Sequence, residues 1–220
     1  TDTASRVMPT RNGFIQGYNA QNVITADGLI LATRLTQCPN DVTFYQPMIN
    51  EAVATAARLA THRPTTGTGT GTGTGTDPTQ IGLVLADAGY LSTDNLTTPG
   101  PDRLIATGKH RTLLHAARDH TPPAQTDPDP TDPHPDSQTD PADPITAMTQ
   151  RLRTPEGITA YNQRSHLAET PHGHLKHNMR FSQLCLRGLP RANAEWTFAT
   201  ATANLFKALP HAARHLPATP

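Results

Sequence analysis

Apolar and polar residues alternate in two short runs near the start of the chain, at positions 18–25 and 29–36. Three residues separate the runs and end in Asp27-Gly28. An Asp-Gly pair between alternating runs is the strongest short-range signal of a β-hairpin. Beyond this hairpin, apolar side chains recur at the spacing of one helical face. That face consists of Met48, Ile49, Ala52, Val53, Ala56 and Leu59. The pattern therefore predicts a hairpin followed by an amphipathic helix.

A short apolar run, formed by Ile81, Leu83, Val84 and Leu85, leads directly to Asp87. Its length and its boundaries at Pro78 and Gly89 predict a strand buried on both faces, as in a sheet covered by helices. A carboxylate just past such a strand lies at the carboxyl edge of the sheet, where ligands and catalytic groups collect in open α/β sheets. The alternative is that Asp87 caps the next turn or helix. Spacing alone favours the cap.

The residues after Asp87 predict a short helix near positions 92–96 and another short strand in "RLIAT". Ser92 has the residue type preferred at a helix N-cap, and Asp94 would lie in the first turn, where a negative charge is favourable.

Composition divides the rest of the chain into ordered and non-core parts. The 220 residues suffice for one ordinary domain, but only 35% are hydrophobic and 21 are prolines. Positions 65–76 form a Gly/Thr repeat, which predicts a flexible linker. Positions 119–150 hold seven aspartates, eight prolines and no Lys or Arg, which predicts a disordered acidic insert. An acidic metal site is the alternative there, but Asp-Pro repeats stiffen the backbone and keep the carboxylates apart.

The formal net charge of zero conceals a basic C-terminal third. Positions 151–220 carry nine Lys or Arg and three Glu, and basic segments of this kind attract phosphate backbones. A solvated helical surface is the alternative. Cys38 and Cys185 are far apart and in no motif, which predicts a reducing compartment. No apolar run is long enough to span a membrane, so we expect a cytoplasmic protein without a membrane partner.

Glu169 is an isolated acid in this basic segment, and Tyr161, Arg164, Lys176 and Arg180 surround it in sequence. We interpret it as a metal ligand on a surface that also holds anionic DNA. Converging carboxylates bind Mg²⁺ through oxygen, and a pair of such ions can activate a water and stabilise a leaving phosphate oxygen.

The motifs "GYNAQNVIT", "PND", "VLADAGYLS" and "IATGK" occur in this order, followed by the cluster Tyr161, Arg164, Glu169 and Lys176. Together with the tail "RFSQLCLRGLPRANAEWTFATATANLFKAL", this set resembles the DDE transposases of bacterial insertion sequences, within the IS4-like group. The resemblance implies an α/β, RNase H-like mixed sheet flanked by helices. It also implies DNA cleavage and strand transfer by two Asp and one Glu that bind two Mg²⁺ (or Mn²⁺) ions.

The resemblance assigns roles to individual residues. Asp87 matches the second Asp of the family, and Glu169 matches the Glu, with Lys176 seven residues further on. DNA, as transposon ends and target, is the implied partner, and the full-length protein is expected to form homo-oligomers. The implied DNA contacts are Tyr161, Arg164, Lys176, Arg180 and Arg187.

The chain also departs from the family pattern. The first Asp of the family lies on a strand upstream of the "GYNAQ" hairpin, and Asp2 resembles the element just before that hairpin instead. We therefore expect an N-terminally truncated transposase that is inactive alone. The alternative is a non-catalytic remnant that binds DNA weakly. Ala168 replaces a bulky residue before Glu169, and Pro171 is tolerable only near a helix start or a kink.

Three further groups have competing interpretations. The histidines 172, 174 and 177 could form a zinc site, but phosphate contact or plain surface is favoured because no Cys or second His pair accompanies them. A terminal helix is predicted to bury Trp196, Phe198, Leu205 and Phe206 in the core. For Asn40-Asp41 before the long helix, helix capping is favoured over metal binding.

Overall fold

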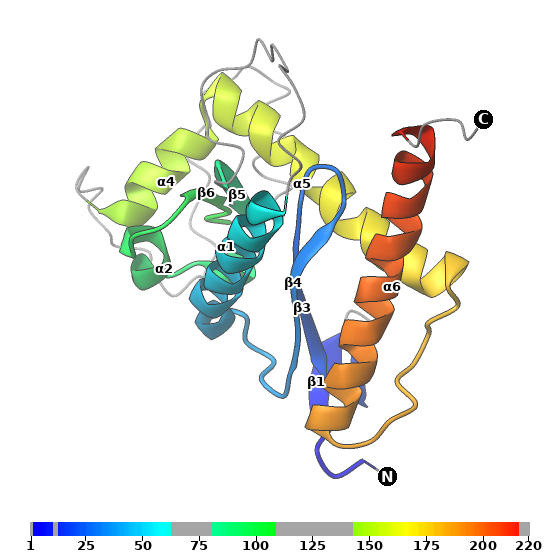
Figure 1. The fold of residues 1–220 in the computed structure, drawn as a ribbon. Helices are drawn as coiled ribbons and strands as arrows, with labels where there is room; N and C mark the ends of the chain where they lie inside the picture. The colour runs from blue at the N-terminus through cyan, green and yellow to red at the C-terminus, as the bar shows by residue number, and fades with distance from the viewer. Residues whose placement is uncertain (1, 11–12, 63–80, 109–142, 216–220) are drawn as a thin grey trace. The chain divides into compact units, whose positions relative to one another are not determined.

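The computed structural model of the chain describes residues 2–10, 13–62, 81–108 and 143–215 (Figure 1). The chain divides into two compact units. The first consists of Thr1–Gln80 with Ser165–Pro220, and the second of Ile81–Arg164. Helix α5 (Pro155–Gly173) contributes residues to both units. The predicted Gly/Thr linker at 65–76, and the predicted acidic insert as far as residue 142, lie outside the described residues.

The predicted hairpin is present in the first unit. Strand β3 (Asn19–Ile24) pairs antiparallel with β4 (Ile30–Thr36). Gly28 has a φ of 78°, in the left-handed region, and its N–H donates to the Thr25 carbonyl oxygen at 2.8 Å. A three-residue loop that ends in a left-handed residue is a standard hairpin connection. The prediction from Asp27-Gly28 is therefore confirmed.

A second hairpin precedes it and was not predicted. Strand β1 (Arg6–Thr10) pairs antiparallel with β2 (Gly13–Gly17). Asn12-Gly13 between "VMPT" and "FIQG" is the sequence signal that could have indicated it.

The predicted amphipathic helix is α1 (Tyr45–Thr61), which follows the short 3-10 turn η1 (Val42–Phe44). Its buried side chains are Tyr45, Met48, Ile49 and Ala52. Val53 and Leu59 are 39% and 56% exposed, so the buried stripe is narrower than predicted.

The C-terminal helix α6 (Leu189–His215) satisfies backbone groups of β4. Figure 1 shows the β3–β4 hairpin between α1 and α6, both of which contact β4. The side-chain oxygen of Asn193 accepts from the Leu35 N–H at 2.7 Å. The Asn204 amide accepts from the Ile30 N–H and donates to the Ile30 carbonyl oxygen, both at 2.8 Å. Among the described strands β4 pairs only with β3, so the backbone groups on its other side need such partners.

The core of the first unit lies between α6, β4 and the segment after α5. Its buried members are Leu35, Leu175, Ala192, Trp196, Ala199 and Ala203. The prediction that α6 buries Phe198, Leu205 and Phe206 was wrong, since they are 74%, 56% and 55% exposed. The buried stripe of α6 consists mainly of alanines at helical spacing, which allow the helix to approach β4 closely, and Trp196 is the single large member.

The second unit is built around a parallel strand pair. Strand β5 (Leu83–Ala86) pairs with β6 (Asp102–Ile105). Between them lie η2 (Ala88–Tyr90) and α2 (Thr93–Thr97). The Ser92 hydroxyl accepts from the Asn95 N–H at 3.0 Å, which confirms the predicted N-cap.

Burial in this unit differs from the prediction that the first strand is covered on both faces. Ile105 on β6 is fully buried, whereas Leu83 on β5 is 39% exposed. The hydrophobic cluster of this unit includes Leu104, Met148, Leu152 and Tyr161. That cluster reaches Leu85 but not the beginning of β5, so the start of the strand is left exposed.

Helix α4 (Pro144–Leu152) overlaps the end of the predicted disordered insert. Asp143 is its N-cap and accepts from the Thr146 N–H at 2.9 Å, and Pro144 occupies the first turn. Positions 144–150 are thus helical, and the prediction of disorder there was wrong.

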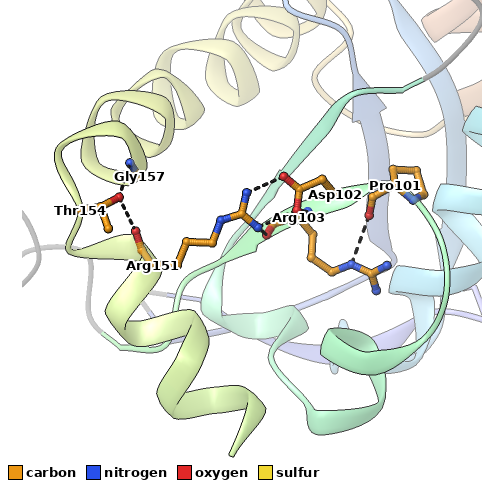
Figure 2. Close-up of polar contacts among 6 residues, drawn as sticks. All are labelled: Pro101, Asp102, Arg103, Arg151, Thr154 and Gly157. Atoms are coloured by element: carbon orange, nitrogen blue, oxygen red, sulfur yellow. Dashed lines mark hydrogen bonds and ion pairs between the residues drawn. The ribbon is translucent and has the colours of Figure 1, made fainter. Parts of the chain in front are cut away.

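The corner between α4 and α5 is held by Thr154, as Figure 2 shows. The Thr154 hydroxyl donates to the Arg151 carbonyl oxygen at 2.9 Å and accepts from the Gly157 N–H at 3.0 Å. The Arg151 side chain forms a bidentate ion pair with Asp102 at the start of β6. The start of α5 is therefore tied to the parallel strand pair.

The described strands form three separate two-stranded sheets, two antiparallel and one parallel. Helices and small sheets are mixed, as expected of an α/β chain. A continuous mixed sheet does not occur among the residues that the structure describes. None of the described helices is long and apolar enough to cross a membrane.

Candidate functional site

Asp87 lies immediately after β5, at the carboxyl end of the parallel pair. It is the N-cap of η2, and its Oδ1 accepts from the Gly89 N–H at 3.0 Å. Its Oδ2 accepts from the Arg164 guanidinium at 2.7 Å. Asp87 therefore lies at the sheet edge and also caps the turn, although the sequence presented these two roles as alternatives.

The sequence assigned Arg164 to DNA and Asp87 to metal, but the structure pairs the two side chains with each other. The side chains are 26% and 42% exposed, respectively. The pair is thus partly accessible to solvent and to ligands.

Tyr161 is buried, in contrast to the predicted DNA contact. It is 4% exposed within the hydrophobic cluster of the second unit. Its hydroxyl donates to the Ala86 carbonyl oxygen at 3.1 Å. Burial, as the main cause, raises the pKa of the Tyr161 phenol above its usual value. A side chain in this position cannot reach a DNA phosphate without leaving the cluster.

Glu169 is exposed on α5 and makes no ion pair with the residues that the structure describes. Two residues later Pro171 is buried inside the same helix, which ends at Gly173. A π-helical turn, η3 (His174–Asn178), follows directly. Pro171 therefore lies inside α5 and not near its start, and the helix type changes three residues after it.

Three of the predicted DNA contacts are exposed cations in the first unit: Lys176, Arg180 and Arg187. Lys176 lies in η3, and the other two lie in the segment between η3 and α6. Arg180 has a φ of 55°, an uncommon conformation for a residue other than glycine. Within the described ranges these cations have no carboxylate partner in an ion pair, so they remain accessible to phosphate.

Among the described residues, His172, His174 and His177 do not gather into a group of three that could hold a metal ion. His172 stacks on Trp196 with ring centroids 6.2 Å apart, and its Nε2 lies 3.4 Å from the Asn22 side-chain amide. Burial first, and then the charge of Lys176, lower the pKa of His172 below its usual value. His172 is therefore a neutral packing residue near neutral pH.

The resemblance implies a pair of metal ions bound by carboxylates. A two-ion centre needs several converging oxygen ligands. In the part of the chain that the structure describes, no group of three or more His, Cys, Asp or Glu side chains could hold a metal ion. These residues do not fit a two-ion centre by themselves.

Sequence reasoning missed two carboxylates that organise the first unit. The capping favoured for Asn40-Asp41 is made by Asn40, whose Oδ1 accepts from the Val42 N–H at 3.1 Å. Asp41 makes no side-chain cap, and its Oδ1 accepts from the side-chain amides of Asn19 at 2.6 Å and Gln21 at 2.5 Å. Asp2 accepts from the Tyr18 hydroxyl at 2.6 Å and from the Gly188 N–H at 3.1 Å. Both bring together residues distant in sequence, which no local pattern indicates.

Exposed cations on an α/β scaffold are features of proteins that act on nucleic acid. Residues 137–209 match the family model described as "Transposase DDE domain". This segment is about a third of the chain and contains Tyr161, Arg164, Glu169 and Lys176, whereas Asp87 lies before it. The match supports a DDE transposase and a transposition-related function. Comparison with curated proteins and with solved structures finds no match.

Proposed function

We propose that the chain acts in DNA transposition as part of the catalytic region of a DDE transposase of the IS4-like group, with an RNase H-like fold. The family match over residues 137–209 carries this proposal, because it spans the whole cluster from Tyr161 to Lys176. Positions 151–220 carry nine basic and three acidic residues, and this net positive charge supports DNA as the partner.

The proposal gives Asp87 and Glu169 the role of metal-binding carboxylates, with Mg²⁺ or Mn²⁺ as the cofactor. Lys176, Arg180 and Arg187, which are exposed, contact DNA phosphates. The active protein assembles as a homo-oligomer on transposon ends and target DNA. We expect that the chain alone does not cleave DNA, and this expectation is supported by the lack of a group of three such ligands among the described residues. This same observation favours the second candidate function, a non-catalytic DNA-binding protein.

A nicking assay separates the two candidates. The purified chain is incubated with transposon-end DNA in Mg²⁺ or Mn²⁺, with Asp87→Asn and Glu169→Gln as controls. We expect no nicking by any of the three proteins. Nicking by the parent chain that disappears in both variants would show that a complete catalytic site exists in the chain.

DNA affinity tests the proposed interface. Fluorescence anisotropy at several salt concentrations gives the slope of log K against log salt, and removing one cation that neutralises a phosphate makes this slope shallower by about 0.9. We expect this decrease for Lys176→Gln, Arg180→Gln and Arg187→Gln. Arg58→Gln is the matched control, since Arg58 is also exposed but lies on α1, outside the basic third. Equal slopes for all four variants would contradict the proposed interface.

A further inference from the structure

Two side chains on α5 contact two consecutive residues at the carboxyl end of β5. The Tyr161 hydroxyl donates to the Ala86 carbonyl oxygen at 3.1 Å, and Arg164 donates to the Asp87 carboxylate at 2.7 Å. Tyr161 and Arg164 are three positions apart, so they lie on the same face of the helix. The sequence suggested that Tyr161 and Arg164 contact DNA, but in the structure their spacing lets both side chains bind the end of β5.

The Tyr161 bond is not needed to satisfy the Ala86 carbonyl. That oxygen already accepts from the Ala106 N–H at 3.1 Å, which continues the pairing of the two strands. The hydroxyl therefore adds a second hydrogen bond to a group that already has one. Because Tyr161 is 4% exposed and packed in the hydrophobic cluster, its ring has little freedom, and the bond holds the end of β5 against α5.

The Asp87 carboxylate is held at both oxygens. Oδ1 accepts from the Gly89 N–H at 3.0 Å and Oδ2 accepts from Arg164, so the rotation of the carboxylate is restricted. An ion pair with a 26% exposed arginine and a 42% exposed aspartate adds little to stability, because solvent screens it. What such a contact does supply is orientation, which a functional carboxylate needs from its neighbours.

The geometry points to Tyr161 and Arg164 as positioning residues for Asp87 and not as contacts to DNA phosphate. Tyr161 fixes the backbone just before Asp87, and Arg164 fixes the carboxylate itself. The inference rests on the proposed function only for the role of Asp87 as the carboxylate that is positioned.

Two measurements on the whole chain test it. The first is labelling of carboxylates with a water-soluble carbodiimide and an amine, with modification at Asp87 quantified by mass spectrometry. We expect increased labelling of Asp87 in Arg164→Gln and in Tyr161→Phe, which retains the ring. Labelling should return toward the wild-type level in Arg164→Lys, because a cation is restored. Lys176→Gln is the control and should label Asp87 as wild type does. Unchanged labelling in Arg164→Gln and Tyr161→Phe would overturn the inference.

The second measurement is the salt dependence of DNA binding. Arg164→Gln should keep the wild-type slope, because its charge is already paired, whereas the slope for Lys176→Gln should be shallower by about 0.9. An equal change in Arg164→Gln would identify Arg164 as a phosphate contact and overturn the inference. Absence of salt-dependent DNA binding by the wild-type chain would instead contradict the proposed function, and the labelling at Asp87 would then decide the inference by itself.

Discussion

Gly157 occupies a position where only glycine fits, and replacing it with alanine should destabilise the corner that begins α5. A Cβ at this position would lie 2.1 Å from the Arg151 carbonyl oxygen. Carbon and oxygen atoms in close contact normally stay about 3.3 Å apart, so the two chain segments would have to separate by roughly 1.2 Å.

The Arg151 carbonyl has little freedom to move away. It accepts from the Thr154 N–H at 3.2 Å and from the Thr154 hydroxyl at 2.9 Å, and the same hydroxyl accepts from the Gly157 N–H (Figure 2). Overpacking of this kind costs about 1–3 kcal/mol, and weakening of the cap costs about 1 kcal/mol more. The higher helix propensity of alanine returns about 1 kcal/mol. We therefore expect Gly157→Ala to lower the free energy of unfolding by about 2 kcal/mol.

Gly173→Ala is the matched control, because it makes the same change in the same helix. A Cβ at Gly173 meets nothing within 4 Å, and the residue has helical dihedral angles of −60° and −44°. Alanine there should be neutral or stabilising by up to about 1 kcal/mol. Urea unfolding followed by far-ultraviolet circular dichroism gives both values. A Gly157→Ala protein as stable as wild type would refute the close approach of the Arg151 carbonyl.

The remaining predictions concern caps, turns and pH. Thr154→Ala removes the cap of α5 and should cost about 1 kcal/mol in urea unfolding. Gly28→Ala forces a left-handed conformation on a residue with a Cβ and should cost about 1–2 kcal/mol, whereas Gly28→Asn should be less destabilising in the same assay. The Tyr18 hydroxyl bond, as the largest cause, lowers the pKa of Asp2, so the stability from this contact is present above about pH 4 and is lost in acid. Partial burial, followed by the Asp2 contact, raises the pKa of Tyr18 to about 12, so this stability is present below about pH 10 and is lost as the pH rises towards 12. Tyr18→Phe should weaken both dependences in thermal unfolding across pH, and unchanged curves would contradict the assigned partners.

Local signals in the sequence predicted the elements that depend on a few neighbouring residues. Asp27-Gly28 located the β3–β4 turn, and Ser92 located the start of α2, because a left-handed glycine and a side-chain cap act within three or four residues. The helix α1 followed from its apolar spacing.

Contacts between distant residues were not predictable in the same way. The face of α6 that is buried carries alanines, while Phe198 and Leu205 point to solvent. Hydrophobicity alone favours the larger side chains for the core, but a helix that satisfies the edge of β4 through Asn193 and Asn204 must approach closely. Small residues permit that approach, so the contact with β4 and not hydrophobicity selected the buried face.

The residues Tyr161, Arg164 and Glu169 belong to one short motif on α5 but have different surroundings, because the helix contributes to both units. Its first part packs in the second unit, where Tyr161 and Arg164 contact the end of β5. Its later part belongs to the first unit, where Glu169 is exposed. A sequence motif read as one DNA-binding surface therefore contains residues that act on the protein itself. Because Gly157 and Thr154 set the start of this helix, we expect changes there to alter the position of Tyr161 and Arg164 and thereby that of Asp87. A Thr154→Ala chain that remains folded should consequently show increased carbodiimide labelling at Asp87, although Thr154 does not contact Asp87. Wild-type labelling in that variant would show that the corner between α4 and α5 does not affect the position of the Asp87 carboxylate.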